Sequence, residues 1–259
     1  DELDTGQEDL LRSFYSKVKA NAAARNSSKA QRFTGLENKE RFFDNNLSPE
    51  LKDKASRQIQ EIIDAIKRGE YMELGIGHTA TAHAQGPDNI CIKNVANEDE
   101  YKKGNNVELE LEIQDRVCNL KIENCQCRAP KPYYYYMDSQ IHLCAMENIN
   151  GVTLNQITKG EFDVPKNFDW HAYFAEAEKF LKAMHQAGLF HRDLHKDNIM
   201  IDRDTLQPVI IDFGKSLDTR LSGHVDDPYI HKGKYLDDLK MIKLHRQDLK
   251  NNKNNQEDI

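Results

Sequence analysis

The feature that most constrains this chain is a polar segment followed closely by an apolar run that ends in Asp-Phe-Gly. The polar segment spans residues 191–198 (HRDLHKDN), and the second segment spans residues 209–214 (VIIDFG). Asp193 and Asn198 fall in a loop after a predicted long helix, and Asp212 ends a predicted strand before a glycine that permits a sharp turn. A loop and a strand end can bring these three side chains to one point, which a single helix could not do.

These three side chains match the requirements of phosphoryl transfer. That reaction needs a carboxylate near the acceptor hydroxyl, and oxygen ligands for Mg²⁺ that bridges the nucleotide phosphates. Asp193, Asn198 and Asp212 supply these groups. The pattern therefore predicts a phosphotransferase centre.

The two segments resemble the catalytic loop H-R-D-x-x-x-x-N and the metal-binding D-F-G of protein kinases. The resemblance implies that ATP and Mg²⁺ are the cofactors, that Asp193 is the catalytic base, and that Asn198 and Asp212 are the metal ligands. It also implies that His191 is a packing residue and that Arg192 pairs with a phosphorylated activation segment.

Two upstream segments resemble the nucleotide-binding parts of the same family. Gly75 and Gly77 take the place of the glycine-rich loop, where glycines let backbone N–H groups approach phosphates, and Ala80 replaces the third glycine. The run Ile-Cys-Ile-Lys that ends at Lys93 resembles the family's V-A-I-K strand. Lys93 is therefore expected to contact the α- and β-phosphates.

The resemblance implies a glutamate partner for this lysine on the next helix. Glu108, Glu110 and Glu112 all compete for the role. In the family pattern apolar residues follow this glutamate at three and seven positions, and Ile113 and Val117 stand there for Glu110. Glu110 is preferred, and Glu112 is the second choice.

A third resemblance concerns residues 144–151 (CAMENING), which look like the strand and hinge that join the two kinase lobes. It implies that Met146 is the gatekeeper beside the nucleotide. The backbone of Glu147 and Ile149 would then bind the adenine edge.

The expected fold class is α+β, a bilobal protein-kinase-like fold with a small antiparallel-sheet N-lobe and a reduced helical C-lobe. Predicted helices begin at Ser48-Pro49 and cover about 99–120, 168–187 and 235–248, and predicted strands cover 71–76, 80–85, 89–94, 132–137, 141–147, 199–201 and 209–211. The predicted divisions are a polar, partly disordered extension over 1–47, an N-lobe with its preceding helix over 48–147, a C-lobe over 148–250 and a polar tail over 251–259. Asp238 is predicted to open the helix that buttresses the catalytic loop.

The chain departs from the protein-kinase pattern in two places. His195 stands two residues after Asp193, where protein kinases usually carry Lys or Ala, and D-L-H-x-x-N resembles aminoglycoside phosphotransferases. Lys196, one place later, is predicted to reach the γ-phosphate. Only 45 residues follow Gly214, with no A-P-E motif. Such a short helical lobe is similar to compact kinases that bacterial pathogens secrete into host cells, and to the Bud32 and RIO atypical kinases.

The leading hypothesis is a Ser/Thr protein kinase that acts on a protein substrate. Its narrower form is a bacterial effector kinase that acts on a host protein. An activating partner protein could complete the reduced lobe. One alternative is a small-molecule kinase of the aminoglycoside-phosphotransferase type, and another is a pseudokinase scaffold. The scaffold is disfavoured because Lys93, Asp193, Asn198 and Asp212 are all present.

The composition of the chain argues against several other classes of function. The net charge of −7 argues against sequence-independent nucleic-acid binding, and no apolar run is long enough to span a bilayer, so a cytoplasmic location is expected. The five cysteines are expected to be free thiols, and a zinc site from Cys118, Cys125, Cys127 and His142 is a weak alternative because its spacing is unusual. The tyrosines of residues 133–136 predict a strand with alternate rings facing core and solvent.

Overall fold

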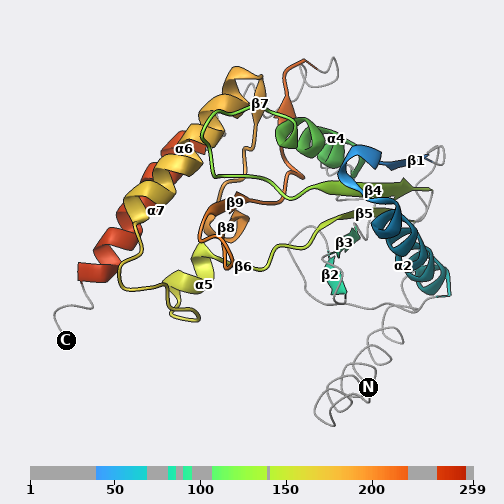
Figure 1. Ribbon diagram of the computed structural model, residues 1–259, viewed down its shortest axis with the longest axis horizontal. Coiled ribbons are helices and arrows are strands. Elements are labelled where there is room, and N and C mark those ends of the chain that lie inside the picture. The colour runs from blue at the N-terminus through green and yellow to red at the C-terminus, as the bar shows by residue number, and fades with distance from the viewer. Residues whose placement is uncertain are drawn as a thin grey trace, which may run out of the picture. The chain divides into compact units, whose positions relative to one another are not determined.

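The computed structural model describes residues 39–68, 81–85, 90–94, 107–138, 141–220 and 238–254. The chain divides into two compact units, the first of residues 1–108 and 133–146 and the second of residues 109–132 and 147–259. Each unit contains both helices and strands (Figure 1), which confirms the α+β class. The predicted glycine-rich loop with Gly75 and Gly77 lies outside the described residues.

The first unit is built on a five-stranded sheet with the order β1-β4-β5-β3-β2. Its strands are β1 (Lys39–Phe42), β2 (Thr81–Gln85), β3 (Ile90–Asn94), β4 (Pro132–Met137) and β5 (His142–Glu147). β1 pairs antiparallel with β4, and β2 pairs antiparallel with β3. The antiparallel sheet predicted for the N-terminal half is therefore present.

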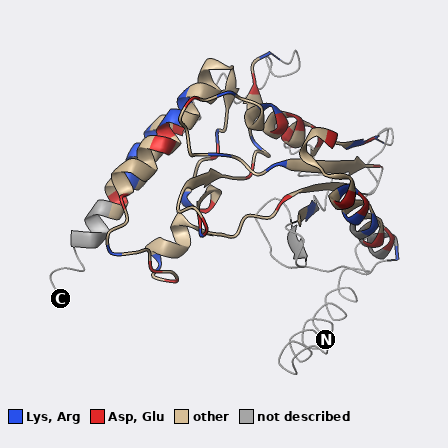
Figure 2. Cartoon of the chain, viewed as in Figure 1, with Lys and Arg blue, Asp and Glu red and all other residues tan. Residues whose placement is uncertain are grey.

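Helix α2 (Pro49–Lys67) packs its apolar stripe against this sheet. The helix begins where the sequence predicts, and Ser48 Oγ accepts a hydrogen bond from the Leu51 backbone N–H at 3.2 Å. Ile59 and Ile63 are buried in one core cluster with residues of β3, β4 and β5. Lys and Arg are interspersed with Asp and Glu along α2 (Figure 2), as is typical of a solvated helix face.

The last part of the polar extension predicted over residues 1–47 has regular structure, which an extension expected to be only partly disordered allows. Residues 39–47 contain strand β1 and the short 3₁₀ helix η1 (Asp44–Asn46). The Phe42 ring lies 4.3 Å from the Tyr134 ring, and Phe43 is buried. Two adjacent aromatic residues therefore anchor a segment whose overall composition is polar.

The predicted strand of tyrosines is present as β4, but its rings do not alternate between core and solvent. Tyr133, Tyr134 and Tyr135 are all buried, so both faces of this strand are covered. The Tyr134 hydroxyl donates a hydrogen bond to Glu40 at 2.8 Å, and the Tyr135 hydroxyl lies 3.4 Å from Glu108. These tyrosines are structural parts of the first unit.

The second unit combines helices with two small sheets. Its helices are α4 (Val107–Cys118, from Leu109 onward), α5 (Leu154–Thr158), α6 (Trp170–Gln186) and α7 (Asp238–Asn254), with the 3₁₀ helix η2 (Lys196–Asn198). β6 (Gly151–Thr153), β8 (Ile199–Asp202) and β9 (Pro208–Ile210) form an antiparallel sheet in the order β6-β8-β9, and β7 (Leu189–Phe190) pairs with β10 (Leu217–Asp218). Of the elements predicted in this half, α6, β8 and β9 are confirmed to within about two residues. The described part of the helix predicted over 99–120 is α4, and α7 extends past its predicted end at 248. β6, α5, β7 and β10 were not predicted.

The core of the second unit surrounds α6. The apolar residues Phe174, Ala177, Leu181 and Met184 of α6 are buried there, and Trp170 is partly buried against them. Asp169 caps the helix through its contact with the Ala172 backbone N–H at 2.9 Å. The structure places residues 109–132 in this unit, whereas the sequence analysis put them in the N-lobe. Ile113 and Val117 of α4 are buried in the same core cluster as α6, which explains this placement.

No helix within the described ranges combines the length and apolar character that crossing a bilayer requires.

Candidate active site

His191 joins the two segments that carry the predicted chemistry. Its side chain is fully buried, and Nε2 donates a hydrogen bond to the Ile211 carbonyl at 2.9 Å. Its ring lies 5.1 Å from the Phe213 ring in an edge-to-face arrangement. His191 is thus a packing residue that fixes the loop after β7 against the segment after β9.

Asp238, at the start of α7, holds the backbone of this loop from the other side. Its carboxylate accepts the N–H groups of His191 and Arg192, each at 2.8 Å, and lies 3.0 Å from His185 Nε2. Burial raises the pKa of Asp238, but the hydrogen bond from His185 and the backbone N–H groups outweigh it and hold the pKa below its usual range. Helix α7 begins at Asp238 as predicted, and this first residue contacts the backbone of the loop that the helix was expected to buttress.

Asp193 presents a carboxylate that is partly open to solvent, with a side-chain exposure of 21%. Its Oδ2 atom lies 2.9 Å from Lys215 Nζ. Its backbone carbonyl accepts hydrogen bonds from the His195 backbone N–H at 2.9 Å and from Asn198 Nδ2 at 2.8 Å. The backbone is fixed while the carboxylate remains reachable, as a base for an incoming hydroxyl requires.

Asn198 is buried and its amide has a defined orientation. Nδ2 donates to the Asp193 carbonyl at 2.8 Å and lies 3.1 Å from His195 Nε2. Both N–H groups of the amide are thereby used, which leaves Oδ1 as the side-chain atom for a ligand. The Ile211 N–H also donates to the Asn198 carbonyl at 3.0 Å, which brings Asn198 close to the segment that holds Asp212.

Asp212 adopts a left-handed backbone conformation, with φ of 62°, and Arg192 does so as well, with φ of 70°. Non-glycine residues in this region carry a strain of about 1–3 kcal/mol each, and such residues cluster at functional sites. The Asp212 carboxylate accepts the Gly214 N–H at 3.3 Å. A carboxylate and an amide oxygen are the hard oxygen ligands that Mg²⁺ prefers, so Asp212 and Asn198 fit this metal.

Lys196, predicted to reach the γ-phosphate, points its ammonium to another acceptor. Its Nζ lies 3.2 Å from Asp248 Oδ2, a carboxylate of α7. The structure instead brings Lys215 to Asp193. The sequence analysis gave Lys215 no role at this centre.

The remaining nucleotide-site candidates belong partly to the first unit. Lys93 lies in β3 opposite Ala82 of β2. The Glu108 carboxylate pairs with Lys39 Nζ at 2.9 Å and contacts the Tyr135 hydroxyl. Glu110, which lies in the second unit, is only 3% exposed. Among the three competing glutamates, Glu110 is therefore the buried one, but its pairing with Lys93 stays a prediction.

The predicted hinge coincides with the boundary between the two units, which falls between Met146 and Glu147. Met146 is buried at the end of β5. The Glu147 N–H donates to the Lys131 carbonyl at 2.8 Å, and its carboxylate pairs with Arg128 at 2.7 Å. Arg128, which the sequence analysis missed, also pairs with Asp202 at 3.1 Å and so fixes the start of the segment that leads to Ile149.

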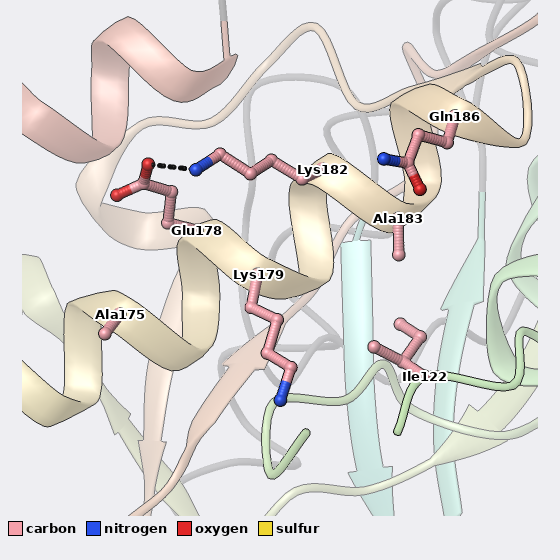
Figure 3. A pocket seen from close by; sticks show the side chains of 7 residues that line it. All are labelled: Ile122, Ala175, Glu178, Lys179, Lys182, Ala183 and Gln186. Atoms are coloured by element: carbon pink, nitrogen blue, oxygen red, sulfur yellow. Dashed lines mark ion pairs between the residues drawn. The ribbon is translucent and has the colours of Figure 1, made fainter. Parts of the chain in front are cut away.

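A hollow on the surface of α6 contains none of the predicted site residues. Figure 3 shows Lys179 and Lys182 from α6 at this hollow, with Ile122 opposite. Lys182 pairs with Glu178 at 2.7 Å, and Lys179 donates to the Asn124 carbonyl at 2.7 Å. These lysines have protein partners, so we assign no ligand to the hollow.

The zinc alternative is not supported in the part of the chain that the structure describes. No group of three or more His, Cys, Asp or Glu side chains there could hold a metal ion. Burial raises the pKa of the Cys118 thiol to about 12 and the pKa of Cys127 well above its usual value. Thiols that resist ionisation are poor metal ligands, because the thiolate is the form that binds.

Comparison with known protein families matches residues 70–232 to the protein kinase domain. The match covers more than half of the chain and includes the loop around Asp193 and the segment around Asp212. The chain therefore belongs to the protein kinase family.

Relatives in two organisms are similar to this chain. A probable serine/threonine-protein kinase of Dictyostelium discoideum is 30% identical over 185 residues, which cover 69% of this chain and 42% of the relative. Serine/threonine-protein kinase D of a Synechocystis strain is 31% identical over 90 residues, which cover 35% of this chain and 17% of the relative. The chain thus spans less than half the length of these curated relatives.

Proposed function

We propose that this chain is an ATP- and Mg²⁺-dependent protein kinase that transfers the γ-phosphate of ATP to a Ser or Thr of a protein substrate. The observation that carries the proposal is one hydrogen-bonded arrangement in the second unit. There the Asn198 side chain bonds the Asp193 backbone, and the Asn198 backbone bonds the residue before Asp212.

Each of the three groups has a role in this proposal. Asp193 accepts the proton of the substrate hydroxyl, since its carboxylate is partly exposed while its backbone is fixed. Asn198 Oδ1 and the Asp212 carboxylate hold Mg²⁺. When bound, the metal neutralises negative charge on the nucleotide phosphates.

The proposed contacts to the nucleotide follow the resemblance to protein kinases. In this proposal Lys93 contacts the α- and β-phosphates with Glu110 as its partner, and the backbone at Gly75 and Gly77 approaches the phosphates. The adenine edge would bind the backbone of Glu147 and Ile149 beside Met146. Burial distinguishes Glu110 from Glu108, whose carboxylate pairs with Lys39.

The test is transfer of labelled phosphate from Mg²⁺-ATP to the chain itself and to proteins of a cell lysate. Asp193→Ala and Asp212→Ala should each lower transfer by about 100-fold or more. Asp204→Ala, which removes an exposed carboxylate that contacts Asn150 in the turn between β8 and β9, is the matched control and should keep full transfer. Circular dichroism must show that all three variants are folded. Full transfer by folded Asp212→Ala would contradict the metal assignment.

A small-molecule kinase is the second candidate, and the position of His195 favours it. Its ring lies 3.7 Å from the Asp193 carboxylate and contacts Asn198, where protein kinases usually carry Lys or Ala. The same assay with aminoglycosides and small metabolites in place of proteins distinguishes the two candidates. Transfer to small molecules without transfer to protein would favour the second.

The narrower hypothesis is an effector kinase that a bacterium delivers into a host cell, with a host protein as substrate. It rests on the resemblance to compact effector kinases. Copurification from a host-cell lysate, followed by the transfer assay, tests this substrate and an activating partner protein together. Transfer only to bacterial proteins would contradict it.

A further inference from the structure

Lys215 contacts the Asp193 carboxylate through its ammonium group. The backbone beside Lys215 is held by hydrogen bonds, while its side chain is half exposed. Lys215 Nζ lies 2.9 Å from Asp193 Oδ2, and the Lys215 side chain is 51% exposed. The next residue, Ser216, is buried, and its hydroxyl donates to the His191 carbonyl at 3.3 Å. The Ser216 N–H also donates to the Phe213 carbonyl at 2.9 Å. The backbone therefore delivers Lys215 to the centre, while its flexible stem can move.

His195 does not supply the group nearest to the Asp193 carboxylate. Its Nε2 lies 3.1 Å from the amide nitrogen of Asn198, and its Nδ1 lies 3.3 Å from the Asp197 backbone nitrogen. The ring is 3.7 Å from the Asp193 carboxylate, whereas Lys215 Nζ is 2.9 Å from it. Lys215 is therefore the closer of these two side chains.

Lys196 does not supply this group either. Its ammonium lies 3.2 Å from Asp248, and its side chain is 23% exposed, so it is less free than Lys215. The position two residues after Asp193, where many protein kinases carry a lysine, is occupied by His195. The chain thus lacks the usual cation of the catalytic loop but has another beside the same carboxylate.

Phosphoryl transfer in this centre needs a cation besides the metal. The Asp193 and Asp212 carboxylates and the γ-phosphate all carry negative charge, and charge on the phosphoryl oxygens must be stabilised in the transition state. We propose that Lys215 is this catalytic cation: it pairs with Asp193 in the nucleotide-free protein and contacts the γ-phosphoryl oxygens of bound ATP. The inference rests on the proposed function.

The step balances without any further reactant. The oxygen of the substrate hydroxyl bonds to the γ-phosphorus, and the bond from that phosphorus to the bridging oxygen of ADP breaks. The hydroxyl proton passes to the Asp193 carboxylate. Lys215 keeps its proton throughout and acts through charge and hydrogen bonding alone.

Calorimetric titration of the purified chain with Mg²⁺-ATP and with Mg²⁺-ADP tests this role, because only ATP carries the γ-phosphate. Lys215→Met should weaken ATP binding by about tenfold or more, as expected for a hydrogen bond to a charged group, and leave ADP binding within about twofold. Lys215→Gln should behave in the same way, and Lys215→Arg should keep most of the preference for ATP.

The matched control is Lys182→Met. Lys182 also forms an exposed ion pair, 2.7 Å from Glu178, and its side chain is 57% exposed, close to the value for Lys215. This variant should bind both nucleotides like the wild type. Lys196→Met is measured beside it, because Lys196 is the rival for the same role.

Each result bears on the proposal. Equal weakening of ATP and ADP binding by Lys215→Met and Lys215→Gln, or no weakening, would overturn the role of Lys215 and leave the kinase proposal standing. A loss specific to ATP in Lys196→Met but not in Lys215→Met would transfer the role to Lys196. A wild-type chain that binds neither nucleotide would overturn the proposed function and this inference together.

Discussion

The carboxylate of Asp238 accepts the backbone N–H of His191 at 2.8 Å across a sequence separation of 47 residues. The same carboxylate accepts the neighbouring N–H of Arg192, whose backbone is in the left-handed region. One buried acid at the start of α7 therefore stabilises the loop conformation that places Asp193. The strained conformation needs this compensation, because the loop has little regular structure of its own.

Replacing Asp238 should destabilise the second unit more than an ordinary surface change. Asp238→Ala leaves two backbone N–H groups without their acceptor, and each such loss costs about 1–3 kcal/mol. Urea unfolding measured by the fluorescence of Trp170, which lies in the same unit, reports the change. Asp248→Ala, which removes an exposed carboxylate from the same helix, should cost less than about 1 kcal/mol. Equal stability of the two variants would contradict the role given to Asp238.

The first unit should lose stability as the pH falls below neutral, because His142 is buried in β5. Burial lowers the pKa of His142 below 6.5, and the opposing hydrogen bond and charge of Asp138 do not restore it. Above pH 6.5 the side chain is neutral in both the folded and unfolded states. Below that pH the unfolded state binds the proton first, so stability is lost as the pH falls from 6.5 toward the folded-state pKa.

Scanning calorimetry at pH 7.5 and pH 5.5 checks this prediction. His142→Phe should show a smaller drop in melting temperature than the wild type. Each unit by which the folded-state pKa of His142 lies below 6.5 adds up to about 1.4 kcal/mol to the loss of stability at low pH. His171→Gln is the control, since His171 is exposed on α6, and it should keep the wild-type drop. His245, whose pKa burial also lowers, adds to the loss in the second unit. An unchanged drop in His142→Phe would show that His142 does not contribute.

The cysteines of residues 118–127 should resist alkylation in the folded protein. The thiolate is the reactive form, and a pKa of about 12 leaves about one Cys118 thiol in ten thousand ionised at pH 8. Cys127 is buried and should react more slowly than Cys125, which is partly exposed. Mass spectrometry after iodoacetamide treatment measures each site, with the chain unfolded in urea as the control. Modification of Cys127 at the rate seen in urea would contradict its burial.

The catalytic segments could be predicted from the sequence because their information is local. The spacing from His191 to Asn198 and the Asp-Phe-Gly after an apolar strand specify both residue types and backbone geometry. The amphipathic helix α6 could be predicted equally well, since four apolar residues recur at helical spacing. The start of α2 followed from Ser48 and the proline after it.

Other features depend on contacts between distant residues, which no single segment encodes. Strand β1 exists because Phe42 packs against Tyr134, some ninety positions later, and its own composition is polar. The pairing of Lys215 with Asp193 could not be read from spacing, because Lys196 is closer in sequence. The Thr153-x-x-Gln156 capping box at α5 is different, because this local signature was in the sequence and was overlooked.

A buried ion pair in the second unit provides the sharpest stability test. Asp218, in β10, is fully buried and pairs with Arg116 of α4, while its Oδ1 accepts the Arg220 backbone N–H at 3.0 Å. Arg116→Met removes the guanidinium of Arg116 from this buried carboxylate, which should cost about 3–5 kcal/mol. The change should also loosen β10, whose Leu217 pairs with Phe190 just before the catalytic loop.

A double variant separates this explanation from a simple loss of packing. Arg116→Met combined with Asp218→Leu removes both charges and should recover most of the stability that Arg116→Met loses, since apolar replacements of buried pairs are often neutral. Arg220→Met, which removes an exposed guanidinium 3.7 Å from Asp218, should cost less than about 1 kcal/mol. Urea unfolding of the wild type, Arg116→Met, Asp218→Leu and the double variant gives the coupling energy. If the losses of the two single changes simply add in the double variant, the buried carboxylate is not the source of the destabilisation.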